Sequence, residues 1–581
     1  MRKRLFGIMA SAAIIAAACS GATTSSAPAV STEPGASAAP ATPAPSVSDM
    51  ADEQILRIDL GNEPPTLDPT QAQDSTSISV LHAISRPLVY LDKDLKAVPA
   101  IAESWDVSAD GKTITFHLRD ANYSNGEPIV AGDAVYSWKR LVDPRTAAPY
   151  SYVTAEIVGA PELLDMAGAD PAPTDAEIEA ALANLGVAAP DDKTFVVSLN
   201  TPATYFVTAA TLWVFAPIQE KWITSPGATE AANYVGSGPF NLDTWDHNSQ
   251  IILKPNPEYF GDQPKLSEIQ MTMTAEPAQA QAAFEAGELD MVSPPTEDIR
   301  RITDDPILGP QVLQTPQFGI TYYDFNNGNG LDRCADLKVC PTANKEFRAA
   351  LSQAIDKQSF IDATFSGVGV VANSMVMPGI PGYLGPDYNP YPFDVTAAQA
   401  HMATALSEIG VASVADLPKL KIGFNTGSGH ETKVAFMAEA WRQAFGLETE
   451  QVGSEWSVFL QQRTAGEYDI SRDGWGADYP HANNQLGGIF TCGGGNNNSQ
   501  TCIPEVDALL AQAAAEADQD KQEELYKQAE AMIFDAASAL QLRFSIATYE
   551  VAPYVAGITQ TGSDSQLPGD QFFETIYILK H

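Results

Sequence analysis

The chain is poor in positive charge, cysteine and histidine, and it has no apolar run long enough to cross a membrane. Its 581 residues include 33 Lys and Arg against 73 Asp and Glu, which gives a formal net charge of -40 at pH 7. A surface of this mean charge repels nucleic acid and anionic lipid, so we expect neither as a binding partner. The five cysteines and seven histidines show no zinc-ligand spacing, so we expect no metal site and no cofactor.

The first 18 residues have the pattern of a secretory signal peptide. The basic start "MRKR" precedes an apolar run of 14 residues, Leu5 to Ala18, which is too short to span a bilayer comfortably. Cys19 follows and resembles the lipidated cysteine of a bacterial lipobox, although Ala16 stands where that motif usually has Leu. Several acyl chains on Cys19 would anchor the protein stably. We therefore predict a signal peptide over 1–18 and a lipid anchor at the outer face of the cytoplasmic membrane.

The segment after Cys19 consists almost only of Ser, Thr, Ala, Pro and Gly. With so few large apolar groups, it cannot offset the conformational entropy that folding removes. We predict a lipid-anchored, disordered linker over 19–50, from which the folded part hangs outside the cell.

The four remaining cysteines form two close pairs, Cys334 with Cys340 and Cys492 with Cys502. In an exported protein, an even number of closely spaced cysteines indicates disulfides. A zinc site is the alternative, but neither pair has Cys-x-x-Cys spacing or a histidine in ligand register. We predict two short loops, each closed by a disulfide.

Hydrophobic spacing predicts a mixed α/β fold. The N-terminal third is rich in strand patterns, and Asp110-Gly111 between two alternating runs indicates a hairpin. Further on, "LKIGFN" reads as a strand, and a helix should run from His430 until Gly446 ends it. The stretches "LETEQVG", "EWSVFLQQRTAGE" and "YDISRDGW" then read as strand, helix and strand. This alternation predicts a parallel sheet covered by helices.

Charged and aromatic side chains follow two of these strands. In open parallel sheets, ligands bind outside the carboxyl ends of the strands. His430 comes after one strand, Arg472, Trp475 and Asp478 lie at the end of another, and Arg463 precedes that strand on a helix. Two cations, an anion, a histidine and an indole around one cleft would suit a zwitterionic ligand.

Many stretches resemble the oligopeptide-binding proteins of bacterial ABC importers, the family 5 extracellular solute-binding proteins, over residues 55–581. They include "NEPPTLDP", "AESWDVSADGKTITFHLRD", "GSGPF", "FRAALSQAIDK", "GWGADY" and "YILKH". In that family, two lobes joined by a hinge close around an extended peptide. The resemblance implies an α/β, two-lobed fold like that of periplasmic binding proteins, with a hinge and an extra N-terminal subdomain. Lobe 1 would comprise 51–85, 222–310 and 547–581, with 86–221 as its subdomain, and lobe 2 would comprise 311–546.

The resemblance also implies the roles of the site residues. Asp478 matches the acid that holds the ligand's α-amine, and Gly474, Trp475 and Gly476 match the segment that pairs with the peptide as a strand. The positions that match partners of the ligand's carboxylate, chosen by ligand length, are Arg463, Arg472 and His430. The positions that match contacts to the ligand backbone are Tyr150 and Ser237.

The chain departs from the family pattern at three positions. Gln73 stands where a relative has an acid, Ser545 stands where it has a tyrosine, and Gly476 replaces a larger residue. These changes keep the peptide class of ligand but leave the preferred peptide length and side chains open.

The function that the resemblance implies is capture of short peptides and their delivery to ABC permease subunits, by a monomer that is not an enzyme. One alternative is the same fold binding a nickel complex or an oligosaccharide. A secreted peptidase is a further alternative, although the sequence contains neither His-Glu-x-x-His nor Gly-x-Ser-x-Gly.

Overall fold

The computed structural model describes residues 49–274, 276–426, 429–494 and 496–581, which belong to one compact unit, Asp49–His581. The predicted signal peptide, Cys19 and the linker up to residue 48 lie outside the described residues. Within the described ranges, every helix is too short or too polar to cross a membrane.

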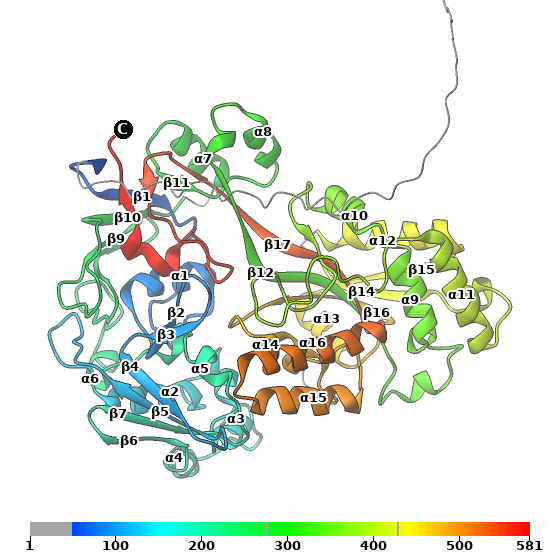
Figure 1. Ribbon diagram of the computed structural model, residues 1–581, viewed down its shortest axis with the longest axis horizontal. Helices are drawn as coiled ribbons and strands as arrows, with labels where there is room; N and C mark the ends of the chain where they lie inside the picture. The colour runs from blue at the N-terminus through cyan, green and yellow to red at the C-terminus, as the bar shows by residue number, and fades with distance from the viewer. Residues whose placement is uncertain (1–48, 275, 427–428, 495) are drawn as a thin grey trace, which may run out of the picture. The chain divides into compact units, whose positions relative to one another are not determined.

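A sheet of 11 strands runs through the described residues (Figure 1). From edge to edge its strands are β15 (Thr449–Ser454), β14 (Leu420–Asn425), β16 (Ile470–Gly476), β12 (Val312–Phe325), β17 (Ala539–Val551), β11 (Met291–Val292), β1 (Ile55–Asp59), β10 (Glu268–Thr272), β9 (Gln250–Pro255) and β8 (Phe240–Asp246), and β13 (Val370–Val371) pairs with β17. Strand β14 is parallel to both β15 and β16, whereas β12 is antiparallel to β16 and β17.

The long strands β12 and β17 are paired and run between two parts of the structure (Figure 1). One cluster of buried apolar side chains draws on residues 56–292 and 549–578, and we call this part lobe 1. Two further clusters draw on residues 318–544, and we call this part lobe 2. The boundaries predicted near 311 and 546 therefore lie next to the start of β12 and inside β17.

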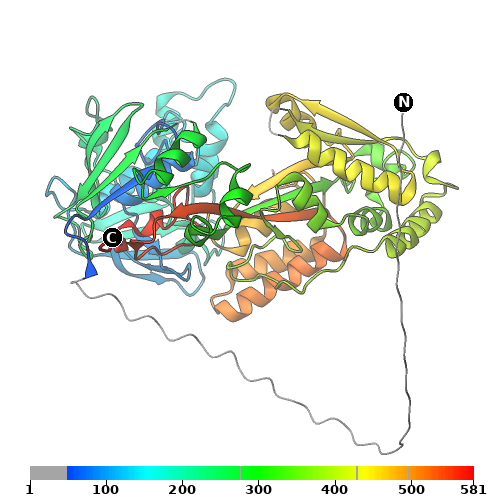
Figure 2. The same cartoon turned by 90° about the horizontal axis from the view of Figure 1, so that it is seen from above.

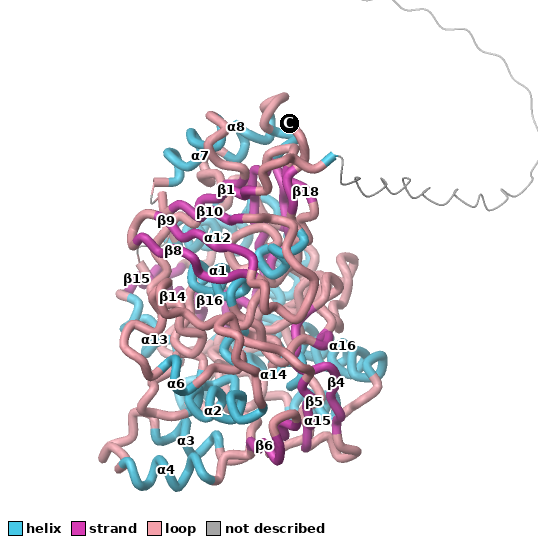
Figure 3. The backbone as a smooth tube through the Cα atoms, turned by 90° about the vertical axis from the view of Figure 1, so that its left-hand side faces the viewer, coloured by secondary structure: helices cyan, strands magenta, loops and turns pink. Residues whose placement is uncertain are grey.

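Lobe 1 carries a second sheet, of four strands in the order β4 (Ala102–Val107), β5 (Thr113–Leu118), β7 (Thr194–Ser198) and β6 (Val187–Asp191). The predicted hairpin joins β4 to β5, and Gly111 adopts a φ of 68° in its turn. Figure 3 shows α3, α4 and β6 of this region at the opposite end of lobe 1 from β1 and β10. The other elements of lobe 1 are α1 (Ser75–Ile84), β2 (Val89–Leu91), β3 (Ala97–Pro99), α2 (Ala131–Val142), α3 (Ala160–Met166), α4 (Asp175–Ala183), α5 (Phe206–Ala209), α6 (Glu220–Ile223), α7 (Pro277–Glu285), α8 (Ile299–Asp304), β18 (Val555–Ala556) and β19 (Tyr577–Ile578).

Lobe 2 confirms the predicted alternation of strands and helices between residues 420 and 476. Helix α12 starts at His430 and ends before Gly446, which has a φ of 70°. Figure 2 shows α12 (yellow) on one face of the sheet and α15 and α16 (orange) on the other, and α11 packs in the same apolar cluster as α12. The helices are α9 (Lys345–Gln353), α10 (Lys357–Thr364), α11 (Val395–Ile409), α12 (His430–Phe445), α13 (Trp456–Thr464), α14 (Ala482–Phe490), α15 (Pro504–Ala515) and α16 (Gln519–Asp535).

Both predicted disulfides are present, and both lie in lobe 2. Cys334 is bonded to Cys340 and Cys492 to Cys502, with sequence separations of 6 and 10. Each bridge therefore closes a short loop, as the spacing predicted.

Glu530 is a buried carboxyl group on α16, inside lobe 2. Its Oε1 accepts hydrogen bonds from the backbone N–H groups of Met375 at 2.6 Å and Val376 at 2.9 Å. Its Oε2 is buried and has no hydrogen-bond partner within the described ranges. Burial raises the pKa of Glu530 from 4.5 to about 8, so the group is mostly protonated at neutral pH.

This protonation predicts a decline in stability with rising pH. Between pH 4.5 and about 8, the folded protein holds a proton on Glu530 that the unfolded chain has released, so stability falls as pH rises through this window. Glu530→Gln stays neutral and should remove that part of the decline in unfolding temperature. Glu524→Gln, at an exposed position of the same helix, is the matched control. If the unfolding temperatures of wild type and Glu530→Gln change with pH in the same way, Glu530 does not have a raised pKa.

Candidate functional site

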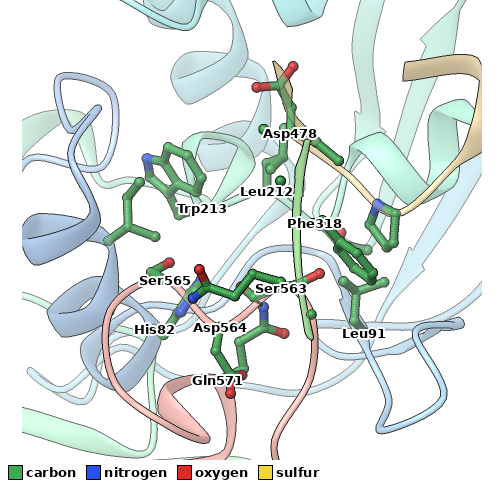
Figure 4. A pocket seen from close by; sticks show the side chains of 18 of the residues that line it. His82, Leu91, Leu212, Trp213, Phe318, Asp478, Ser563, Asp564, Ser565 and Gln571 are labelled. Atoms are coloured by element: carbon green, nitrogen blue, oxygen red, sulfur yellow. Dashed lines mark hydrogen bonds between the residues drawn. The ribbon is translucent and has the colours of Figure 1, made fainter. Parts of the chain in front are cut away.

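A cavity of about 330 Å³ lies where lobe 1 meets the strand ends of lobe 2 (Figure 4). In Figure 4, Asp478 lies on the opposite side of the cavity from Gln571. The side chains that line it include two acids and His82 but no lysine or arginine. Its walls are formed by Ile78, His82, Tyr90, Leu91, Tyr150, Thr211, Leu212, Trp213, Gly562, Ser563, Asp564, Ser565 and Gln571 of lobe 1 and by Gln317, Phe318, Gly319, Gly476, Ala477, Asp478, Pro480 and Ser545 of lobe 2.

A second cavity, of about 230 Å³, shares Asp478 with the first. Asp478 therefore lies where the two cavities meet. Both cavities are lined by residues of lobe 1 and of lobe 2. The other wall residues of the second cavity are Tyr152, Val153, Ala155, Glu156, Tyr205, Phe206 and Ala209 of lobe 1 and Trp475, Tyr479, Asn483, Asn484, Gly487, Gly488 and Asn496 of lobe 2.

The Asp478 carboxylate is held by neutral donors. The hydroxyl of Tyr152 donates to its Oδ1 at 3.0 Å, and the side-chain amide of Asn484 donates to its Oδ2 at 3.0 Å. Burial raises the pKa of Asp478, and the two hydrogen bonds oppose that shift. No ion pair to Asp478 is found in the described part of the chain, so this acid is oriented but not neutralised.

Strand β16 ends two residues before Asp478, and one of its two edges is largely unpaired. It pairs with β12 along its whole length, from Phe325–Ile470 to Gly319–Gly476. On its other side, β14 pairs only with Ile470 and Ser471. From residue 472 to 476, this second side has no strand partner among the residues that the structure describes. Gly474 and Gly476 are exposed there, so another extended chain can approach the backbone closely.

Trp475 is tied to the same network as Asp478. Its indole Nε1–H donates to Oδ1 of Asn484 at 2.7 Å, and the backbone N–H of Asp478 donates to the same oxygen at 3.2 Å. The indole lines the second cavity. Asn484, the third residue of α14, thus positions both predicted site residues.

Arg472 and His430 form a hydrogen-bonded pair. Arg472 Nε donates to His430 Nε2 at 3.1 Å. Burial, and then the Arg472 charge, lowers the pKa of His430 to about 4, so the imidazole is neutral at pH 7. Because Nε2 accepts this bond, the imidazole proton is on Nδ1. This Nδ1 is buried and has no hydrogen-bond partner in the described ranges.

Arg463 has a carboxylate partner inside lobe 2. Its Nη1 lies 2.7 Å from Oδ2 of Asp473, with side-chain exposures of 14% and 7%. Asp324 lies in the same cluster with 1% exposure, and neither of its oxygens has a hydrogen-bond partner among the described residues. Burial, and then the Asp473 charge, raises the pKa of Asp324 well above its ordinary value. The ligand role of Arg463 stays a prediction, and the contact that the structure shows is with these two acids.

The structure brings Tyr150 into the first cavity but not Ser237 or Gln73. The Tyr150 ring lies 4.9 Å from that of Trp213, and burial raises the pKa of its phenol to about 12. Ser237 has 3% exposure, and its Oγ accepts a hydrogen bond from the backbone N–H of Arg86 at 2.9 Å. Gln73 is exposed in the loop before α1. Neither Ser237 nor Gln73 is among the wall residues of the two cavities.

Sequence reasoning missed the partners of Asp478. Tyr152 stands two residues after the predicted Tyr150, and Asn484 follows Asp478 by six residues, so both were close to recognised stretches. The wall segment 562–565 carried no signal of its own, because only the return of the chain to lobe 1 brings it to the cavity.

Comparison with known proteins identifies a protein family. The family model described as "Bacterial extracellular solute-binding proteins, family 5 Middle" matches residues 96–497. The oligopeptide-binding protein OppA of Bacillus subtilis (strain 168) is 30% identical over 544 residues, which is 91% of this chain and 93% of that protein.

Solved structures agree with this match. The periplasmic murein tripeptide-binding protein MppA, in its unliganded open form, has a TM-score of 0.77 and 26% identity over 92% of this chain and 98% of its own. OppA of Haemophilus influenzae, in complex with RPPGFSPFR, has a TM-score of 0.66 and 28% identity over 91% of this chain and 100% of its own. These similarities confirm the predicted fold class, an α/β fold with two lobes like that of periplasmic binding proteins.

Proposed function

Because the chain belongs to family 5 of the bacterial extracellular solute-binding proteins, we propose that it captures short peptides between its lobes and delivers them to an ABC permease. The observation that carries this proposal is Asp478, an oriented acid without an ion pair in the described chain, at the end of the open edge of β16. An extended peptide would pair its backbone with this edge and place its α-ammonium at Asp478.

The same geometry gives the bound peptide a direction. Arg472 stands at the start of the open edge and Asp478 just after its end. Six residues of extended chain span roughly 20 Å at about 3.3 Å per residue. A peptide with its amine at Asp478 therefore runs its carboxylate toward Arg472 and His430. This span suits a ligand of about four to six residues, and binding through the backbone leaves its sequence largely free.

Thermal shift against three ligand panels tests this proposal and its alternatives. A random peptide library with free N-termini should raise the unfolding temperature, because a ligand that binds only the folded state stabilises it. Oligosaccharides and nickel complexes should leave it unchanged. The described residues contain no group of three or more His, Cys, Asp or Glu that could hold a metal ion. A shift with sugars or nickel complexes but none with peptides would favour the same fold with a non-peptide ligand.

We also propose that the protein, as a monomer, binds its ligand without changing it. The sequence lacks the zinc-protease and serine-hydrolase motifs named above, and family 5 is a family of binding proteins. Peptides incubated with the protein and then released by denaturation should therefore have unchanged masses. Recovery of cleaved peptides at a rate that follows protein concentration would indicate a peptidase.

Membrane attachment should depend on Cys19. If this residue carries lipid, the mature protein should fractionate with membranes, and Cys19→Ser should release it into the soluble fraction, whereas Ser20→Ala should not. Mass spectrometry without reduction should find no free thiol, because the other four cysteines are paired. Membrane attachment of Cys19→Ser would contradict the anchor.

A further inference from the structure

Three neighbouring cations of lobe 2 form no ion pair in the described part of the chain. They are Lys433 on α12, Arg472 on β16 and Arg543 on β17. Three other arginines of this lobe do form ion pairs, Arg333 with Asp469 at 3.0 Å, Arg442 with Glu439 at 2.7 Å and Arg463 with Asp473 at 2.7 Å. In a chain with 73 acids and 33 bases, three neighbouring cations that form no ion pair are unexpected, although the charge of Asp473 acts on Arg472.

Strand register places the two arginines on one face of the sheet. On β12, Tyr323 is opposite Arg472 of β16, and Thr321 is opposite Arg543 of β17. Residues two apart on a strand point to the same face, and so do directly paired residues. Tyr323 packs in the apolar cluster that includes α12. Arg472 and Arg543 therefore point toward the side of the sheet that α12 covers.

Lys433 joins them from α12. The Lys433 ammonium and the Arg543 guanidinium lie 4.6 and 4.1 Å from the centroid of the same ring, Phe365. His430, which accepts the hydrogen bond from Arg472, stands three residues before Lys433 on the helix, where neighbours face each other. Burial, and then the charges of Arg472 and Arg543, lowers the pKa of Lys433.

The cluster reaches the first cavity through Ser545. Arg543 Nη1 donates to Ser545 Oγ at 3.4 Å, and Ser545 lines the cavity together with Asp478. Arg543 Nε also donates to the backbone oxygen of Val368 at 2.7 Å, which fixes the direction of its guanidinium. Hydrogen bonds thus fix the two arginines, and the buried Nδ1–H of His430 is one further donor without a partner in the described ranges.

We propose that Lys433, Arg472 and Arg543 form a site for two carboxylates at one end of the ligand, so that the protein prefers peptides whose last residue is Asp or Glu. This inference rests on the proposed function, because it needs a peptide whose carboxylate lies near Arg472. A single α-carboxylate cannot form an ion pair with all three cations. A second carboxylate, on the side chain of the last residue, would give the cluster a second partner.

Matched peptides test this preference. Calorimetry should compare tetrapeptides and pentapeptides of alanine that end in Glu or in Gln, which have the same shape and differ in charge. We expect wild type to bind the Glu peptide about tenfold more tightly, a difference of about 1.4 kcal/mol. Lys433→Met and Arg543→Met should each move this ratio toward one. Arg442→Met, at an exposed position of α12 that pairs with Glu439, should keep the ratio of wild type.

The outcomes separate this inference from the proposed function. If wild type binds both peptides with equal affinity, or if both variants keep the full preference, the two-carboxylate site is wrong while peptide capture stands. If no peptide binds to the wild type, the proposed function fails and the inference with it. Should Arg543→Met fail to fold without its bond to Val368, Lys433→Met decides, since its ammonium makes no hydrogen bond in the described ranges.

Discussion

Asp478→Asn should lower the affinity for peptides with a free α-amine by on the order of two to three and a half decades in dissociation constant. A bound α-ammonium would be enclosed by both lobes, and Asp478 is the acid at the junction of the two cavities. Removing its charge leaves a buried cation unpaired, which costs roughly 3–5 kcal/mol. Asparagine keeps the size and one acceptor, so the variant tests charge and not packing.

The control ligand for this variant is the same peptide with an acetylated N-terminus. Wild type should bind it poorly, and Asp478→Asn should reduce its binding little further, because no ammonium is present. Asp535→Asn, which changes a surface acid 2.8 Å from Lys345, should leave both affinities within about threefold of wild type. If Asp478→Asn binds free peptides within about threefold of wild type, the amine is held elsewhere.

Arg463→Met should lower the free energy of unfolding of the ligand-free protein by roughly 3–5 kcal/mol, the usual effect of removing one partner from a buried ion pair. The Arg463 guanidinium is the only cation in ion-pair contact with Asp473 among the described residues, and Asp324 lies beside them with no hydrogen bond to either oxygen. Methionine would fill most of the volume but leave Asp473 without its ion-pair partner. Denaturant unfolding without ligand measures this loss.

Two comparisons identify the cause of that loss. Arg472→Met removes a cation that forms no ion pair within the described ranges, so it should lower the unfolding free energy less than Arg463→Met does. The double variant Arg463→Met with Asp473→Asn also removes the acid left unpaired and should recover part of the stability. If Arg463→Met is as stable as wild type but binds peptides weakly, Arg463 serves the ligand's carboxylate, as the family resemblance implied.

The sequence by itself determined the features whose signals are local. The limits of α12 follow from Gly429 and Gly446, which take φ values of 63° and 70° that other residues rarely adopt. The hairpin at Gly111 and the two disulfides join residues close in the chain. The order of strands and helices in lobe 2 follows from hydrophobic spacing in the same way. These elements bring "RDGWGADYP" to the end of a strand, where a binding site was predicted.

Only the tertiary structure decided which charges meet. Arg463 and Arg472 both stand near Asp473 in the sequence, yet Arg463 forms the ion pair and Arg472 bonds to His430. Tyr152, a partner of Asp478, is 326 residues away from it along the chain. Lys433 and Arg543 were not recognised at all, because strand register and the packing of α12 and Phe365 bring them together. A charge has no preferred partner in sequence, since its pairing depends on the distance and the dielectric that only the assembled lobes create.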